Sequence, residues 1–351
     1  MTDAPSWQRT RWARVLIPVL ITVVTSVALY VLEIWSRANT PLKDLADGYR
    51  FQPWSSNWMM QNLGIEDMAA YGPMSLLLKH VYPPGLDAIR YVLMLPETNA
   101  GLPTDQVAVD MRLYLVYCLF FGVTNALAYV WVKDLTRSVW WGLGGAALWA
   151  LAPGHLLAAT LLEPTELSLL TIGFCYYFLY RFLKTRRAVY VPAFLFSLLV
   201  GSLARSFLQS YVLVILIVAV VCFWFMTKDR GRTWGWQALN VVLLLLILAW
   251  PVKQYVMYGT SSPSTFSGYH RVGMLNVNPT TVPALDTPQK YVDNALKFSS
   301  RYNTQEVLKD NYRLEHAADA YIREHPIDAA KGLAHSLTIT IPEMLRPTTM
   351  Y

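Results

Sequence analysis

Long apolar runs without charge constrain this chain more than any other feature of its sequence. Such runs cover residues 15–32, 113–132 and 233–252, and each is close to the roughly 20 residues that cross a bilayer as a helix. Two further apolar stretches, 138–180 and 189–227, are too long for one crossing each. With 54% hydrophobic and only 15% charged residues, the sequence is that of a membrane protein.

The first apolar run allows two interpretations, because Arg9, Arg11 and Arg14 precede it as they would precede the core of a signal peptide. An uncleaved anchor fits better. The run is about 18 residues long, and the following "YVLEIWSRANT" has no clear cleavage site between small residues.

Basic residues cluster beside the apolar runs and predict which loops are cytoplasmic. Four segments, 9–14, 133–137, 181–187 and 228–232, hold twelve of the 29 Lys and Arg residues, with only three Asp residues in or near them. Cytoplasmic loops of membrane proteins carry such an excess. The net charge of +6 therefore reports orientation, and no nucleic-acid partner is expected.

Cytoplasmic clusters require an even number of crossings between them, so each of the two long stretches is expected to form a hairpin. The prediction is an all-α polytopic membrane protein with about seven transmembrane helices and a cytoplasmic N-terminus. Residues 1–256 form the transmembrane core, with a first outer loop at 36–112. Residues 257–351 form an outer, mainly helical segment.

Local patterns add detail to the two outer segments. In the first, "MSLLLKHV" and "GLDAIRYVLML" flank "YPPG" and predict short juxtamembrane helices at the membrane surface. In the second, a Ser-rich loop, "YGTSSPSTFSGYHRVG", precedes a helix capped by Thr287 and another from Thr304 to Glu324. All three cysteines fall inside apolar runs, so no disulfide or metal framework is expected.

On this topology the outer face gathers the residues that are best suited to chemistry. They are Asp44, Asp47, His80, His155, Glu163, Glu166, Arg205, His270 and Arg271. A carboxylate held near the bilayer boundary has a raised proton affinity and serves as a general base. Guanidinium and imidazolium groups bind the phosphate that a lipid-linked substrate presents at this depth.

Six of these residues also have a simpler structural interpretation. Asp44 and Asp47 fit a solvated turn after a membrane helix, because Gly48 follows them. Glu163 and Glu166 fit acids at a helix N-terminus. Arg205 fits a helix end and His155 fits a turn. No His, Cys or acidic pair has the spacing of a zinc site, so no metal ligand is assigned.

Several stretches of sequence resemble one known class of membrane enzyme. These stretches are "SNWMMQNLGIEDMAAYGPMSLLLKHVYPPGLDAI", "LEPTELSLLTIGFCYYFLYRFLKTRR", "LVGSLARSF", "YGTSSPSTFSGYHRVGMLN" and "ADAYIREHPIDAAKGL". In order and sidedness they are similar to polytopic glycosyltransferases of the GT-C class, the bacterial mannosyl- and arabinosyltransferase-like enzymes that use polyprenyl-phosphate-linked sugars.

The resemblance implies a reaction and roles for individual residues. A sugar passes with inversion from a polyprenyl-phosphate donor in the bilayer to a glycan, lipid or protein acceptor. A catalytic aspartate in the first outer loop deprotonates the acceptor hydroxyl. Asp47 matches that residue best, since aromatics follow it in "DGYRF", and Asp44 is second.

The same resemblance implies that Arg205 and either His270 or Arg271 face the donor phosphate, with Glu163 or Glu166 as the supporting acid. His80 and His155 complete the substrate-binding set. No cofactor is implied with certainty, and a requirement for a divalent cation is left open. The implied location is a bacterial plasma membrane with the active face outside.

Two other functions stay open. A transporter or lipid flippase would place ionisable residues near the midplane on broken helices. A catalytically silent scaffold of an envelope complex is the second alternative, because GT-C members commonly continue with more transmembrane helices after a "YIREHP"-like segment, whereas this sequence ends at Tyr351.

Overall fold

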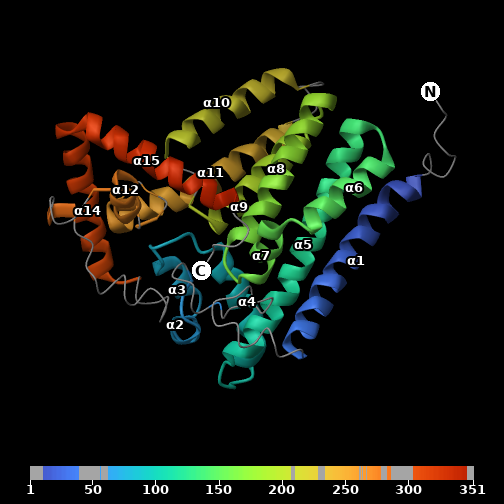
Figure 1. Cartoon of the computed structure of the whole chain (residues 1–351), viewed down its shortest axis with the longest axis horizontal. Helices are drawn as coiled ribbons and strands as arrows, with labels where there is room; N and C mark the ends of the chain where they lie inside the picture. Colours follow the sequence, from blue (N-terminus) through green and yellow to red (C-terminus); the bar gives the residue numbers. More distant parts are fainter. Residues whose placement is uncertain are drawn as a thin grey trace. The chain divides into compact units, whose positions relative to one another are not determined.

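The computed structural model describes residues 11–38, 56, 62–206, 210–227, 234–260, 262, 264–265, 267–277, 283–285 and 303–345. This part of the chain forms 14 α-helices and a short 3-10 helix, with no β-strand (Figure 1). The predicted all-α class is confirmed.

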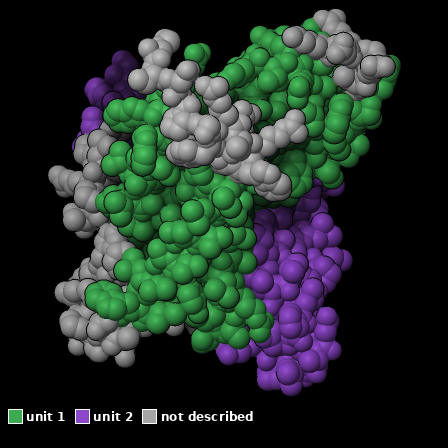
Figure 2. Space-filling model, turned by 90° about the vertical axis from the view of Figure 1, so that its right-hand side faces the viewer, with its two compact units in different colours: residues 1–55, 107–204, 217–247 green, residues 56–106, 205–216, 248–351 purple. Residues whose placement is uncertain are grey.

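The chain divides into two compact units, each assembled from segments far apart in the sequence (Figure 2). Unit 1 comprises residues 1–55, 107–204 and 217–247, and unit 2 comprises residues 56–106, 205–216 and 248–351. The predicted division into 1–256 and 257–351 stays a prediction.

Unit 1 contains most of the long apolar helices. They are α1 (Arg11–Ala38), α5 (Gln106–Thr136), α6 (Val139–Ala150), α7 (Pro153–Thr160), α8 (Thr165–Thr185) and α9 (Tyr190–Ala204). Helices α10 (Ser210–Met226) and α11 (Trp234–Tyr258) contribute residues to both units.

Helices α1 and α5 lie side by side in unit 1 (Figure 1), in contact through small residues. A Cβ atom added at Gly122 of α5 would overlap the Thr22 carbonyl and the Ser26 side chain of α1. The Ser26 hydroxyl donates to the Cys118 carbonyl at 2.8 Å. Close backbone approach and a hydroxyl bond between helices are the usual means of holding apolar helices together in lipid.

Helices α8 and α9 form a hairpin whose turn begins at Arg186, a residue with φ of 56° that ends α8 in the left-handed conformation. The Cys175 thiol of α8 contacts the Phe194 carbonyl of α9 at 3.8 Å. Phe223 of α10 packs its ring against Phe182 at a centroid distance of 5.0 Å. Aromatic packing therefore joins the hairpin to α10 within unit 1.

Unit 2 contains short helices from the first outer segment and helices from the C-terminal part of the chain. They are α2 (Ile65–Tyr71), α3 (Pro73–Leu78), α4 (Gly85–Asn99), α12 (Ser267–Leu275), η5 (Pro283–Leu285), α14 (Gln305–Glu324) and α15 (Pro326–Leu345). Leu275, Leu285, Ala318 and Ala329 form one of its apolar clusters. At Gly268 the backbone N–H donates to Asn311 Oδ1 at 2.7 Å, where a Cβ atom would meet the backbone of α14.

Three described helices are long and apolar enough to cross a membrane: Val15–Trp35, Gln106–Thr136 and Trp234–Tyr258. They coincide with the three charge-free runs predicted from sequence. Helices α6 and α7, bent by 58° at their junction, count as a fourth span if the pair crosses as one. These helices indicate a multi-pass membrane protein.

The expectation of about seven crossings is wrong for the part of the chain that the structure describes, which has three to four candidate spans. At 1.5 Å per residue, the 15 residues of α9 cover about 22 Å, less than the roughly 30 Å of a hydrocarbon core. Helix α8 has 21 residues, but Glu166, Arg181 and Lys184 interrupt its apolar character. The number of crossings inferred from basic clusters takes no account of helix length or of charged residues within a helix.

Three of the predicted outer helices are found, and a fourth falls outside the described residues. Thr304 caps α14 by accepting from the Val307 N–H at 3.4 Å, and α15 begins at Pro326, directly after His325. This confirms the predicted helix at 304–324. The helix expected after Thr287 lies outside the described residues. The juxtamembrane pieces form α3 and α4, separated at Pro84 as "YPPG" predicted.

Candidate functional site

The structure distributes the predicted site residues over both units. His155, Glu163 and Glu166 belong to unit 1, whereas His80, Arg205, His270 and Arg271 belong to unit 2. The two aspartates, Asp44 and Asp47, lie outside the described residues. Each unit therefore contains its own group of candidate site residues.

In unit 1 the structure brings His155 and Glu166 together. His155, in the first turn of α7, has Nε2 at 3.2 Å from Oε1 of Glu166, in the first turn of α8. Both side chains are buried. The rings of Phe121 and Trp149 flank the imidazole at centroid distances of 4.5 and 5.0 Å.

The contacts of His155 engage both nitrogens of its ring. Its Nδ1 lies 3.2 Å from the Trp149 carbonyl. A carbonyl oxygen only accepts, so Nδ1 donates to it. The Nε2 atom bonds to Glu166 Oε1 and so links the first turns of α7 and α8 through two buried side chains.

The second oxygen of Glu166 is unusual for a buried group. Oε2 is buried and has no hydrogen-bond partner among the described residues. Oε1 of Glu166 also accepts a hydrogen bond from the Thr124 hydroxyl at 3.3 Å. Thr124 was absent from the residues predicted from sequence, because a threonine inside an apolar helix carries no local pattern that marks it.

Glu163 plays a different part from Glu166, although both flank the start of α8. It is half-buried, its carboxylate accepts from the Thr165 hydroxyl and its carbonyl accepts from the Tyr117 hydroxyl. The buried partner of His155 is Glu166 and not Glu163, and which of the two acids supports the reaction stays a prediction.

In unit 2, His80 is part of an extended strap, residues 78–82, that is held by polar side chains. The His80 carbonyl accepts from Gln254 at 2.8 Å, its N–H donates to Asn303 at 2.7 Å, and its Nδ1 lies 2.8 Å from the Thr265 hydroxyl. Burial, and to a smaller extent the positive charge of Lys253, lower the pKa of His80 to about 4. His80 is therefore a neutral, structurally engaged histidine.

Arg205 and His270 come together in unit 2. Partial desolvation of the ring lowers the pKa of His270, and the nearby positive charge of Arg205 lowers it further. On its other side, His270 Nε2 lies 3.2 Å from the Tyr82 hydroxyl. At the end of the strap, the imidazole of His270 thus contacts a phenol and lies within reach of the charge of a guanidinium. Tyr82 was missed because its partner lies far away in sequence.

Arg271, the neighbour of His270, faces a different set of groups. Its guanidinium pairs with Glu315 at 3.2 Å and with Asp319, both on α14. These two carboxylates compensate the charge of Arg271, so its ion pairs hold α12 against α14. Of the two alternatives for a phosphate ligand, His270 is the one that lies beside Arg205.

A buried charged cluster in unit 2 was not predicted at all. Asp87 accepts from Lys79 and from Arg90, the latter at 2.7 Å, and from the Leu63 N–H at 3.1 Å. The three side chains are at most 3% exposed. Burial lowers the pKa of Lys79, and Asp87 opposes this effect. The cluster anchors α4 to the strap.

No group of three or more His, Cys, Asp or Glu residues is placed to hold a metal ion within the described ranges. The sequence matches no protein-family model and no curated protein. Within the described residues, the polar groups best suited to chemistry are Arg205, His270 and Tyr82 in unit 2 and the His155–Glu166 pair in unit 1.

Proposed function

We propose that this protein is an inverting glycosyltransferase that moves a sugar from a polyprenyl-phosphate donor to a cell-envelope acceptor at the outer face of a bacterial plasma membrane. The proposal joins the GT-C-like sequence stretches to the candidate spans. The observation that carries it is the meeting of Arg205 with His270 in one unit.

This pair suits the departing phosphate of such a donor. Arg205 supplies a permanent positive charge and a planar set of N–H donors that match phosphate oxygens. His270 is neutral near pH 7, because its pKa is lowered. The Tyr82 hydroxyl lies 3.2 Å from its Nε2 and holds the imidazole in place.

The proposed reaction is a single displacement. Asp47, or Asp44 in its place, takes the proton of the acceptor hydroxyl as that oxygen attacks the anomeric carbon. The bond from the anomeric carbon to the phosphate oxygen breaks, and its electron pair leaves with the polyprenyl phosphate. Arg205 and His270 stabilise the negative charge that develops there. Attack from the opposite face inverts the anomeric configuration.

A transfer assay on the purified full chain in proteoliposomes tests this proposal. A radiolabelled polyprenyl-phosphate sugar is mixed with an extract of cell-envelope acceptors, and label that leaves the lipid donor is followed. Time-dependent transfer supports the enzyme. Donor binding without any turnover would favour the silent scaffold instead.

One observation favours transport as a second candidate function. His155 and Glu166 are buried together beside the break between α6 and α7, and carriers place such ionisable groups at broken helices. Movement of the labelled donor across the proteoliposome membrane, with no new glycosidic bond formed, would favour a flippase. Transfer without such movement would exclude it.

A further inference from the structure

The extended strap, residues 78–82, is held in unit 2 by hydrogen bonds to its backbone carbonyls. The part of the chain that the structure describes has no β-strand to pair with it, so these carbonyls need other donors. The donors are Tyr258 and Asn303 to Leu78, Lys253 to Lys79, Gln254 and the Thr265 N–H to His80, and Ser264 to Val81. They lie at the end of α11, in the loop that follows it and directly before α14.

Asn303 bonds to the strap through both ends of its side-chain amide. Its Oδ1 accepts from the His80 N–H at 2.7 Å and from the Val81 N–H at 3.4 Å, and its Nδ2 donates to the Leu78 carbonyl at 3.4 Å. The amide thus supplies the acceptor and the donor that a neighbouring β-strand would supply. Because Thr304 caps α14, Asn303 also joins the strap to the beginning of that helix.

The bonds to Val81 determine where the side chain of the next residue, Tyr82, begins. The Val81 N–H donates to Asn303, and the Val81 carbonyl accepts from Ser264. Tyr82 is buried, and its hydroxyl lies 3.2 Å from His270 Nε2. A displacement of the Val81 backbone would therefore move the phenol away from the imidazole.

Helix α14 also holds the helix on which His270 lies. Asn311 of α14 accepts from the Gly268 N–H of α12 at 2.7 Å. The strap and α12 are thus both attached to α14, the strap through Asn303 at its beginning and α12 through Asn311. Because the rise per residue of a helix is fixed, α14 sets the distance between Tyr82 and His270.

We propose that Asn303 is a positioning residue of the phosphate site, which holds the strap so that the Tyr82 hydroxyl keeps His270 in place beside Arg205. Asn303 acts through the strap backbone and is not itself a catalytic residue. The inference rests on the proposed function, since that function assigns the donor phosphate to Arg205 and His270.

Side-chain NMR of His270 in the purified full chain tests this role. In Asn303→Ala the released strap lets water reach the ring, so the lowered pKa of His270 should rise toward its ordinary value of about 6.5. At about pH 8, where the imidazole is neutral in both proteins, the dissociation constant for a short isoprenyl phosphate should increase about fivefold. An unchanged pKa and an unchanged dissociation constant would overturn the proposal.

Ser264→Ala is the milder second variant, because it removes only one of the bonds to the strap carbonyls. It should shift both readouts in the same direction as Asn303→Ala but by less. If Asn303→Ala does not fold, an unaltered His270 in Ser264→Ala would overturn the proposal.

A double-variant cycle tests the route through Tyr82. Tyr82→Ala removes the phenol, so adding Asn303→Ala to it should change the pKa of His270 little further. Fully additive changes would show that Asn303 does not act through Tyr82 and would overturn the proposed role.

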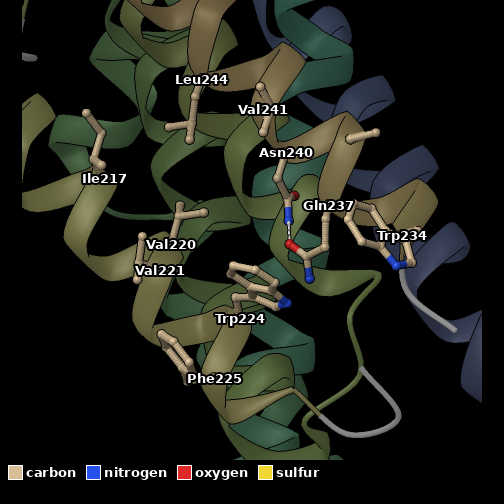
Figure 3. A pocket seen from close by; sticks show the side chains of 11 residues that line it. Ile217, Val220, Val221, Trp224, Phe225, Trp234, Gln237, Asn240, Val241 and Leu244 are labelled. Atoms are coloured by element: carbon tan, nitrogen blue, oxygen red, sulfur yellow. Dashed lines mark hydrogen bonds between the residues drawn. The ribbon is translucent and has the colours of Figure 1, made fainter. Parts of the chain in front are cut away.

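A buried asparagine of unit 1 offers the matched control. Asn240 of α11 lines an apolar groove between α10 and α11, and its Nδ2 donates to Gln237 Oε1 at 3.1 Å (Figure 3). None of the residues that hold the strap lines this groove. Asn240→Ala should therefore leave His270 and the affinity for isoprenyl phosphate unchanged, and a change as large as that in Asn303→Ala would overturn the proposal.

These readouts do not depend on sugar transfer. A chain that binds isoprenyl phosphate at His270 but transfers no sugar would contradict the proposed function while supporting the phosphate site. A response of His270 that is the same in Asn303→Ala as in the unmodified chain would overturn the positioning role even if sugar is transferred.

Discussion

His155 Nε2 and Glu166 Oε1 lie 3.2 Å apart, with both side chains at most 1% exposed, in a part of the chain where α6 and α7 bend by 58°. Two ionisable groups buried together are costly to remove singly, because the remaining partner keeps its desolvation penalty. The pair is therefore a structural constraint on this part of unit 1.

Removing one member of this pair should destabilise the protein. Glu166→Ala leaves buried His155 without its carboxylate and is expected to lower the free energy of unfolding by about 2–3 kcal/mol. Glu163→Ala, at a half-buried acid of the same turn, is the matched control and should cost less. Thermal unfolding in detergent measures both, and equal losses would contradict the assigned partnership.

Substitution in the buried Asp87 cluster should lower the free energy of unfolding more than substitution in the His155–Glu166 pair. Asp87→Asn keeps the shape of the side chain but leaves Lys79 and Arg90 buried with no carboxylate between them. A loss of about 3–5 kcal/mol is expected. Glu66→Gln, at an exposed position on α2, should have little effect. A loss under about 1 kcal/mol for Asp87→Asn would show that the cluster is not paired as described.

Stability should fall as the pH drops from about 6.5 to about 4, and His80 should account for much of this. Its pKa is about 4 in the folded chain and about 6.5 when unfolded, so the unfolded state binds the extra proton first. The loss across this window is about 3 kcal/mol. His80→Gln should flatten the pH dependence, whereas His335→Gln, at an exposed position, should leave it unchanged.

Substitutions of Arg205 and of Arg271 should differ in their effects on kinetics and on stability. Arg205→Gln is expected to lower kcat/KM for the lipid-linked donor by about tenfold to a hundredfold, as expected for loss of a charged contact to phosphate. Arg271→Gln should instead weaken the packing of α12 on α14 and lower the melting temperature. The reverse pattern would assign the phosphate contact to Arg271.

Binding of a phosphate should also be visible at His270. An anion beside the imidazole favours its protonated form, so its lowered pKa should rise when inorganic phosphate or a short isoprenyl phosphate binds. Side-chain NMR of histidine in the full chain follows this change. In Arg205→Gln the response to phosphate should be smaller, and an unchanged response would place the anion elsewhere.

Patterns that act over one helix predicted this fold well. The three apolar runs became the three long helices, and Thr304 capped α14 as its sequence indicated. Interactions between distant segments were beyond such patterns. Asp87 was expected on a surface helix, yet it is buried with Lys79 across the "YPPG" break.

The candidate site shows the same limit. The predicted topology placed Arg205, His270 and Arg271 on the same side of the membrane. The structure distinguishes Arg271 from His270, because Arg271 pairs with two acids of α14. Likewise, the sequence could not show that Glu166 rather than Glu163 contacts His155, because this contact joins two helices. The number of crossings failed for a different reason, since charge clusters report sidedness and not whether a helix is long and apolar enough to span.

Transfer of sugar by the aspartate variants tests the central proposal most directly. Asp47→Asn, Asp44→Asn and the double variant are compared with the unmodified chain for release of radiolabel from a polyprenyl-phosphate sugar, after thermal unfolding has established that each is folded. We predict that Asp47→Asn abolishes transfer and that Asp44→Asn reduces it less. Full activity in both single variants and in the double variant would contradict the proposed glycosyl transfer mechanism.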